Sequence, residues 1–236
     1  MDLNKLDRLT KEKLLDFLME YITPNKKKKF EEVLSYRTRH LAVVLEDLYQ
    51  PHNASAVLRT CDCTGIQDVH IIENRNEYQV NRDVALGSSK WLNLIKFSET
   101  DNNTLSAFEY LRNKGYRIVA TSPHRSDVEL HDLDIREKTA LVFGTELEGL
   151  SEVALDNADA YVKIPMYGFT ESYNISVSAA IILSTLTHKL RSSEIKWQLS
   201  ESEKTQIKLN WAASVLKKYD SFEKQFFKLH QQEKGI

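Results

Sequence analysis

Short apolar segments alternate with amphipathic helical segments between residues 41 and 190, and this alternation constrains the fold more than any other feature of the sequence. The apolar segments have the continuous hydrophobic character of strands that are buried on both faces. We expect strands at 41–48, 69–73, 91–97, 116–122, 139–144 and 160–166. We expect helices at 53–64, 105–115, 151–156 and 174–190. This order is typical of an α/β domain with a mostly parallel sheet.

Helical segments flank the α/β region on both sides. Residues 2–36 carry leucines at helical spacing, interrupted by Pro24, and 200–231 is typical of two further helices. We therefore expect three parts: an N-terminal helical extension at 1–38, one α/β domain at 39–192 and a C-terminal helical extension at 193–236.

The charge balance limits the kind of partner that the chain can bind. The sequence has 32 Lys and Arg against 34 Asp and Glu, a net charge of −2, which argues against a protein that coats nucleic acid by bulk charge. A local basic patch is still compatible with RNA binding. Lys26–Lys29 is one candidate patch, although a solvated helix face explains it more simply.

The compartment follows from two further features. No run approaches the roughly 20 apolar residues that a membrane span needs, and the N-terminal residues lack the pattern of a secretory signal. Cys61 and Cys63 are too close in sequence to be a probable disulfide pair and have too few neighbouring ligands for a metal site. We expect a cytoplasmic protein with reduced thiols, no membrane partner and no metal.

The common nucleotide-binding and hydrolase motifs are missing. None of the seven glycines belongs to a GxGxxG, a GK[ST] or a GxSxG motif, so the dinucleotide fingerprint, the P-loop and the hydrolase elbow are all absent. Three polar loops remain, each of which follows an expected strand, where open α/β sheets hold their ligands. They are PHNASAVLRT (51–60), FGTELEGLS (143–151) and IPMYGFTESYNIS (164–176).

Each loop carries candidate site residues that also have a simpler structural explanation. We place Asn53 at the N-cap of its helix, from where Arg59 could reach a phosphate or pair with Glu146. Glu146 could hold Arg59, bind a ligand amine or be an ordinary surface glutamate. Ser172 and Asn174 precede the long helix, so helix capping explains them as well as ligand binding does.

Together and in this order, the three loops resemble the motifs of SpoU-type (TrmH) RNA 2′-O-methyltransferases of the SPOUT superfamily. That family shows HNxSAxxRT, FGxExxGL and IPMxGxxxSxNxSVA, and this chain has HNASAVLRT at 52–60, FGTELEGL at 143–150 and IPMYGFTESYNISVSA at 164–179. GSSKW at 87–91 is also similar to a family segment. The resemblance covers about 40–190. Tyr173 stands where the family usually has leucine, and Ser178 replaces a common alanine.

The resemblance implies a fold, a cofactor and a quaternary state. The C-terminal part of the sheet domain would be threaded as a deep trefoil knot, and the protein would be a homodimer with its active site at the subunit interface. S-adenosylmethionine would bind in the knot. The expected cofactor-binding residues are Thr121, Gly144, Ile164, Met166 and Tyr173.

The resemblance also implies the reaction, which is 2′-O-ribose methylation of RNA. The forty residues before the domain are too few for the separate RNA-binding domain of many relatives, which favours tRNA, with the D-loop guanosine at position 18 as the expected target. Ribosomal RNA, another tRNA site and a non-catalytic RNA-binding role are the alternatives. The expected catalytic residues are Asn53, Arg59, Glu146, Ser172 and Asn174. Because a guanidinium stays protonated, we interpret Arg59 as an electrostatic stabiliser rather than a base.

Overall fold

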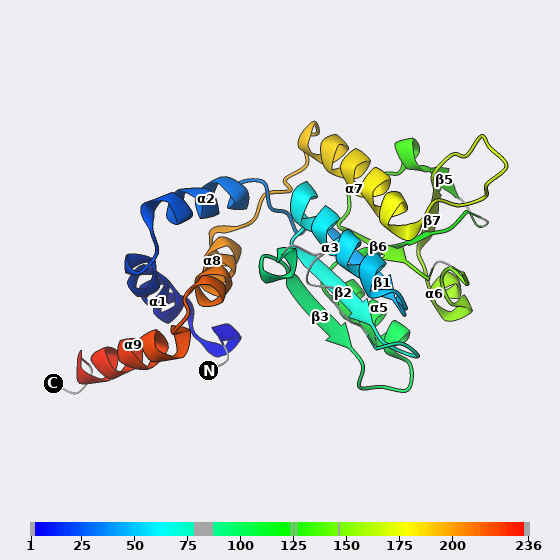
Figure 1. Cartoon of the computed structure of the whole chain (residues 1–236). Helices are drawn as coiled ribbons and strands as arrows, with labels where there is room; N and C mark the ends of the chain where they lie inside the picture. Colours follow the sequence, from blue (N-terminus) through cyan, green and yellow to red (C-terminus); the bar gives the residue numbers. More distant parts are fainter. Residues whose placement is uncertain (1–2, 78–86, 124, 126, 146, 234–236) are drawn as a thin grey trace. The chain divides into compact units, whose positions relative to one another are not determined.

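A computed structural model describes residues 3–77, 87–123, 125, 127–145 and 147–233 of the chain (Figure 1). Contacts divide it into two compact units, Thr38–Trp197 and a helical unit formed by Met1–Arg37 together with Gln198–Ile236. Within the described ranges, none of the helices is both long and apolar enough to cross a membrane. The expected domain boundaries at 38/39 and 192/193 stay a prediction.

The unit Thr38–Trp197 is built on a seven-stranded sheet in the order β3-β2-β1-β6-β4-β7-β5. Every neighbouring pair of strands is parallel. The strands are β1 (Leu41–Glu46), β2 (Asp68–Ile72), β3 (Asn93–Phe97), β4 (Arg117–Thr121), β5 (Val128–Glu129), β6 (Thr139–Phe143) and β7 (Ala160–Lys163). The predicted α/β class with a mostly parallel sheet is therefore confirmed.

Helices cover both faces of this sheet, which explains the continuous apolar character of its strands. They are α3 (Pro51–Thr64), α5 (Asn103–Asn113), α6 (Glu152–Asp156) and α7 (Ile175–Arg191), with short 3-10 helices η2 (Ser88–Lys90) and η3 (Leu130–Asp132). Leu41, Val43 and Leu45 of β1 belong to a core shared with α3 and α7, which lie side by side (Figure 1). Ala42 and Val44 point the other way, into a second core with α5 and α6.

The first helix of the sheet domain corrects one prediction. Asn53 is not the N-cap residue, because α3 begins at Pro51 and Gln50 is its N-cap. Proline is well suited to the first helical position, since its fixed φ is already helical and its missing N–H would have no partner there. Asn53 is instead buried inside the first turn of α3.

Other elements differ from prediction mainly at their ends. β1 stops at Glu46, because Asp47 takes a left-handed conformation with φ of 53°. β7 stops at Lys163, and the predicted strand residues up to 166 belong to the loop that follows. Neither β5 nor η3 was predicted.

The helical unit is assembled from the two ends of the chain. Its helices are η1 (Leu3–Lys5), α1 (Arg8–Glu20), α2 (Pro24–Leu34), α8 (Glu201–Val215) and α9 (Tyr219–Glu233). α1 packs against α8 and α9, and the rings of Phe17 and Phe226 lie 5.7 Å apart between their centroids. Phe30 of α2 meets Trp211 of α8 edge to face at 5.3 Å. The sequence did not predict that the two helical extensions would pack together.

Candidate functional site

A cavity of about 400 Å³ opens at the carboxyl ends of β4, β6 and β7. Its wall includes all five residues that were expected to bind a cofactor, which come from different loops: Thr121, Gly144, Ile164, Met166 and Tyr173. Parallel strands bring their carboxyl ends to one edge of the sheet, so loops far apart in sequence meet there. The volume is within the range of small-molecule sites.

The loop after β6 is a tight hairpin whose described residues line one side of the cavity. Thr145 and Gly149 exchange two backbone hydrogen bonds, with nitrogen-to-oxygen distances of 2.8 Å and 3.1 Å. A Cβ atom at Gly144 would lie 2.1 Å from the carbonyl oxygen of Gly149, so only glycine fits there. Gly149 itself has φ of 70°, which glycine adopts without strain. The two glycines thus have separate reasons to be glycine.

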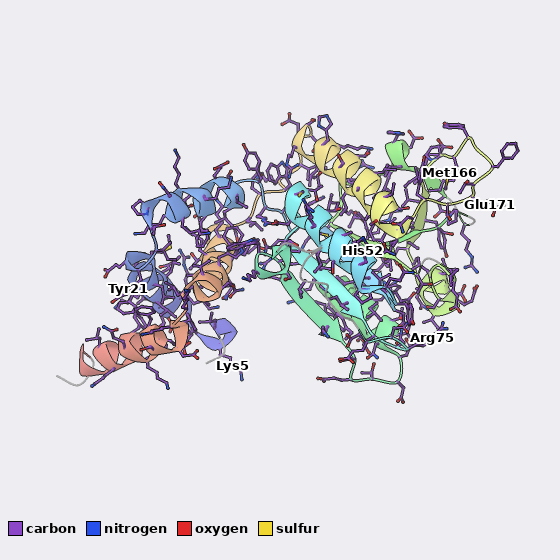
Figure 2. All side chains as sticks on the ribbon, viewed as in Figure 1. Lys5, Tyr21, His52, Arg75, Met166 and Glu171 are labelled. Carbon is purple, nitrogen blue, oxygen red and sulfur yellow. The ribbon has the colours of Figure 1, made fainter. Side chains whose placement is uncertain are left out.

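The loop from β7 to α7 forms the opposite wall. Ile164 and Met166 line the cavity near the end of β7, and Glu171, Ser172 and Tyr173 line it before α7. Met166 and Glu171, which both belong to this loop, are labelled in Figure 2. Tyr173 is 45% exposed in addition to lining the cavity. Its ring is therefore available to a ligand, where the related family usually carries leucine.

One face of helix α7 forms a further part of the wall of the same cavity. Ile175, Ser178 and Ile182 all line it, and their spacing of three and four residues places them on one face of the helix. Asn174 caps this helix, since its Oδ1 accepts the backbone N–H of Ser176 at 2.9 Å. The capping interpretation of Asn174 is therefore confirmed, although capping leaves its Nδ2 group available.

That Nδ2 group joins two of the predicted catalytic residues. Asn174 Nδ2 donates to Asn53 Oδ1 at 3.4 Å, although the two residues are 121 positions apart. Asn53 in turn donates through Nδ2 to Gln50 Oε1 at 3.1 Å. The first turns of α3 and α7 therefore meet through a pair of amides next to the cavity loop that ends at Asn174.

The remaining predicted catalytic residues are placed differently. Ser172 lines the cavity, whereas Arg59 lies on the exposed face of α3 and is not among the described residues of the cavity wall. Glu146 lies outside the described residues, so the proposed Arg59–Glu146 pair stays a prediction. The structure brings Asn174 and Asn53 together beside the loop that carries Ser172, whereas Arg59 is exposed on α3 and is not among the described residues of the cavity wall.

Charged groups line the mouth of the cavity beside β4. Arg125 pairs with Glu152 at 2.9 Å and with Asp156 at 3.0 Å. The hydrogen bond that Arg125 donates to the Asp156 carboxylate holds the pKa of Arg125 above its ordinary value. The Thr121 hydroxyl already has a hydrogen-bond acceptor, the carbonyl oxygen of Val142 at 2.8 Å, and this bond connects β4 with β6.

Sequence reasoning missed several residues of the wall. Ser122 and Arg125 follow β4, and the rule that ligands bind after strand ends could have identified them. Ser178 and Ile182 could have been found from the helical spacing with Ile175. No metal-binding group of three or more His, Cys, Asp or Glu side chains is present among the described residues, in which Cys61 is buried and Cys63 exposed, both as free thiols.

Comparisons with known proteins agree with this geometry. Residues 40–184 match the model of the SpoU rRNA Methylase family. The tRNA (guanosine(18)-2′-O)-methyltransferase of Borreliella burgdorferi is 47% identical over 211 residues, which cover 89% of this chain and 95% of that protein.

Solved structures give the same result. The TrmH/SpoU tRNA modifying enzyme of Aquifex aeolicus superposes with a TM-score of 0.72 at 32% identity, covering 82% of this chain and 98% of that one. The SpoU methyltransferase AviRb of Streptomyces viridochromogenes, solved in complex with AdoMet, shares the fold with a TM-score of 0.58 at 23% identity, covering 69% of this chain and 65% of that one.

The hairpin geometry predicts unequal effects at its two glycines. Gly144→Ala should destabilise the protein by about 3 kcal/mol, because the new Cβ collides with backbone that has no room to shift cheaply. Gly149→Ala should cost about 1 kcal/mol, because its Cβ meets open space and only the left-handed φ is strained. Urea unfolding of both variants measures this difference. Equal losses would contradict the close approach of Gly144 to Gly149.

Proposed function

The chain belongs to the SpoU rRNA Methylase family, and on this premise we propose that it methylates the ribose 2′-hydroxyl of guanosine 18 in tRNA with S-adenosylmethionine as methyl donor. The observation that carries this proposal is near full-length similarity to a relative named for that reaction. The family name refers to ribosomal RNA, so the choice of tRNA rests on this relative.

The cavity is suited to the proposed cofactor by size and by the chemistry of its walls. Gly144 lets the two sides of the hairpin approach so closely that no side chain fits between them, and both Gly144 and Gly149 line the cavity. Ile164, Met166 and Tyr173 supply apolar contacts, and Glu171 supplies a carboxylate at the same wall. These residues, with Thr121, would hold S-adenosylmethionine. When bound, the cofactor supplies a methyl group made electrophilic by its sulfonium.

The chain's own residues would position the ribose. We assign Arg59 to the phosphate beside the target nucleotide and to the negative charge that develops on the 2′ oxygen as its proton passes to solvent water. A guanidinium serves both roles because it stays protonated and presents a planar set of donors. The amide pair of Asn53 and Asn174, together with Ser172, would orient the ribose, and Glu146 would fix one side of the site. Such positioning contributes several kcal/mol to catalysis.

A homodimer would place Arg59 of one subunit beside the cavity of the other subunit. Because Arg59 is exposed and absent from the described wall of its own cavity, we propose that it reaches the cavity of a second subunit across a two-fold interface. The exposed side of α7 supports this arrangement, since Val177 is 44% exposed there and Ala180, three residues later, is also exposed. We also propose that the chain from β6 to α7 is threaded as a trefoil knot, which rests on the family resemblance.

The reaction predicts which tRNA accepts the methyl group. Unmodified tRNA should accept label from methyl-labelled S-adenosylmethionine, and the label should map to nucleotide 18. The same tRNA made with 2′-deoxyguanosine at position 18 should accept none, because the nucleophilic oxygen is missing. Ribosomal RNA serves as the second substrate. Label in ribosomal RNA but not in tRNA, or label that persists in the deoxy substrate, would overturn the assignment.

Arg59 should matter to turnover far more than to folding. Arg59→Ala is expected to lower the single-turnover rate by about a hundredfold or more, the usual cost of removing a group that stabilises developing charge. Arg59→Lys should recover little activity, because lysine lacks the planar fork. Melting temperature and cofactor affinity should change little. Arg112→Ala on α5, which removes an arginine paired with Asp159 away from the cavity, is the matched control. A normal single-turnover rate in Arg59→Ala would exclude Arg59 from the mechanism.

The proposed interface predicts the mass in solution. Sedimentation equilibrium at micromolar concentration should give twice the chain mass of 27.3 kDa. Val177→Glu, which places a charge on the exposed side of α7, should shift the species toward the monomer and lower activity in parallel. A monomer with full activity would contradict the shared site.

A further inference from the structure

A buried carboxylate lies behind the hairpin that walls the cavity. Glu46 is the last residue of the central strand β1 and is 2% exposed. It accepts three hydrogen bonds, from Thr104 Oγ1 at 2.6 Å, from the backbone N–H of Ser151 at 2.9 Å and from Ser151 Oγ at 2.8 Å. A buried charge needs such complete pairing, so Glu46 is bound to its partners in one arrangement.

These bonds hold the downstream end of the hairpin. Ser151 follows the hairpin directly and is the N-cap residue of α6, where its Oγ accepts the backbone N–H of Ala154 at 3.1 Å. The upstream end is held by the sheet, because Leu45 of β1 is in register with Phe143 of β6. Both ends of the hairpin are therefore fixed to the end of the same strand, one by the ladder and one by Glu46.

A second tether from the same strand end reaches the outer part of the hairpin. The Asp47 carboxylate accepts the backbone N–H groups of Asn74 at 2.7 Å and Arg75 at 2.8 Å. Arg75 then donates to Glu148 in the hairpin at 3.0 Å. Asn74 Nδ2 donates to Thr104 Oγ1 at 2.9 Å, which connects this tether to Glu46. The Arg75–Glu148 pair is exposed and weak, so Glu46 provides the principal anchor.

We propose that Glu46 is a positioning residue for methyl transfer, which sets cofactor affinity by fixing the hairpin through Ser151. Glu46 is not among the described residues that line the 400 Å³ cavity, so it acts through the described hairpin residues Gly144, Thr145 and 147–150 rather than by contact with a ligand. The inference rests on the proposed function, because it requires that this cavity holds S-adenosylmethionine. It adds a residue outside the three sequence motifs to the machinery of the site.

An amide cannot replace this carboxylate, although it has the same size. All three groups that face Glu46 are donors in the structure. The amide of Glu46→Gln can take two orientations. If its oxygen accepts the Ser151 N–H, its NH₂ group faces the hydroxyls of Thr104 and Ser151, and the Thr104 hydroxyl loses the acceptor that it has in the wild type. If its oxygen accepts the two hydroxyls, its NH₂ group faces the Ser151 N–H, and two donors oppose each other. Either way at least one buried hydrogen bond to a charged group is lost.

Glu46→Gln should therefore weaken S-adenosylmethionine binding about tenfold in calorimetry, the effect of one lost hydrogen bond to a charged group. The KM for cofactor should rise by the same factor, while the KM for tRNA and the kcat at saturating cofactor stay near wild type. Tyr116→Phe is the matched control, because it removes one buried hydrogen bond, from the Tyr116 hydroxyl to the Arg39 carbonyl, at the opposite end of the strands. It should lower the melting temperature without changing cofactor affinity.

A double-mutant cycle tests whether Glu46 acts through Ser151. Ser151→Ala should weaken cofactor binding several-fold, and the double variant should bind no worse than the weaker-binding single variant, because both changes remove one connection. Additive losses would overturn the proposal, as would unchanged cofactor affinity in Glu46→Gln. If Glu46→Gln does not fold, Ser151→Ala decides alone, and unchanged cofactor affinity there refutes the inference. Failure of the wild-type protein to bind S-adenosylmethionine would instead refute the proposed function.

Discussion

The structure depends on one constraint, which is that a parallel sheet buried on both faces brings all its strand ends to the same edge. β1 shows this best, because its successive residues enter two different cores, Leu41, Val43 and Leu45 with α3 and α7 and the alternate residues with α5 and α6. A strand that is fixed on both faces has only one register. The carboxyl end of β1 is therefore held in a fixed position. Glu46 is its last residue, and Asp47 and the turn into α3 follow directly.

Two loops, one after β6 and one after β7, form most of the wall of the cavity at this edge. Gly144 and Gly149 let the hairpin after β6 fold tightly on itself, and the loop after β7 closes the other side. A site of this kind needs no glycine-rich dinucleotide fingerprint, since its main-chain groups are positioned by hydrogen bonds within the hairpin and by the buried carboxylate of Glu46 behind it. Burial makes that carboxylate costly, and its three donors offset the cost.

The candidate catalytic groups do not all lie beside the cavity, and this separation is the basis of the proposed two-fold site. Ser172 and the Asn53–Asn174 pair lie at the start of α7, next to the cavity loop. Arg59 lies on the exposed face of α3 instead. An arginine that is free to meet a phosphate and a second subunit is consistent with a two-fold site, in which each cavity and each Arg59 belong to different chains.

The sequence by itself determined the mostly parallel α/β class, most strands and helices and the cap at Asn174, because these depend on local periodicity and on polar residues placed just before a helix. The five residues expected at the cavity followed from the resemblance of its loops to the SpoU motifs. Tertiary structure alone decided the rest. β5 has two residues and no pattern, and Pro51 rather than Asn53 begins α3. The contacts of Glu46 with Thr104 and Ser151 span 58 and 105 residues, and that of Asn174 with Asn53 spans 121. Such pairs leave no local signal, since only the packing of the sheet edge brings their side chains within hydrogen-bonding distance.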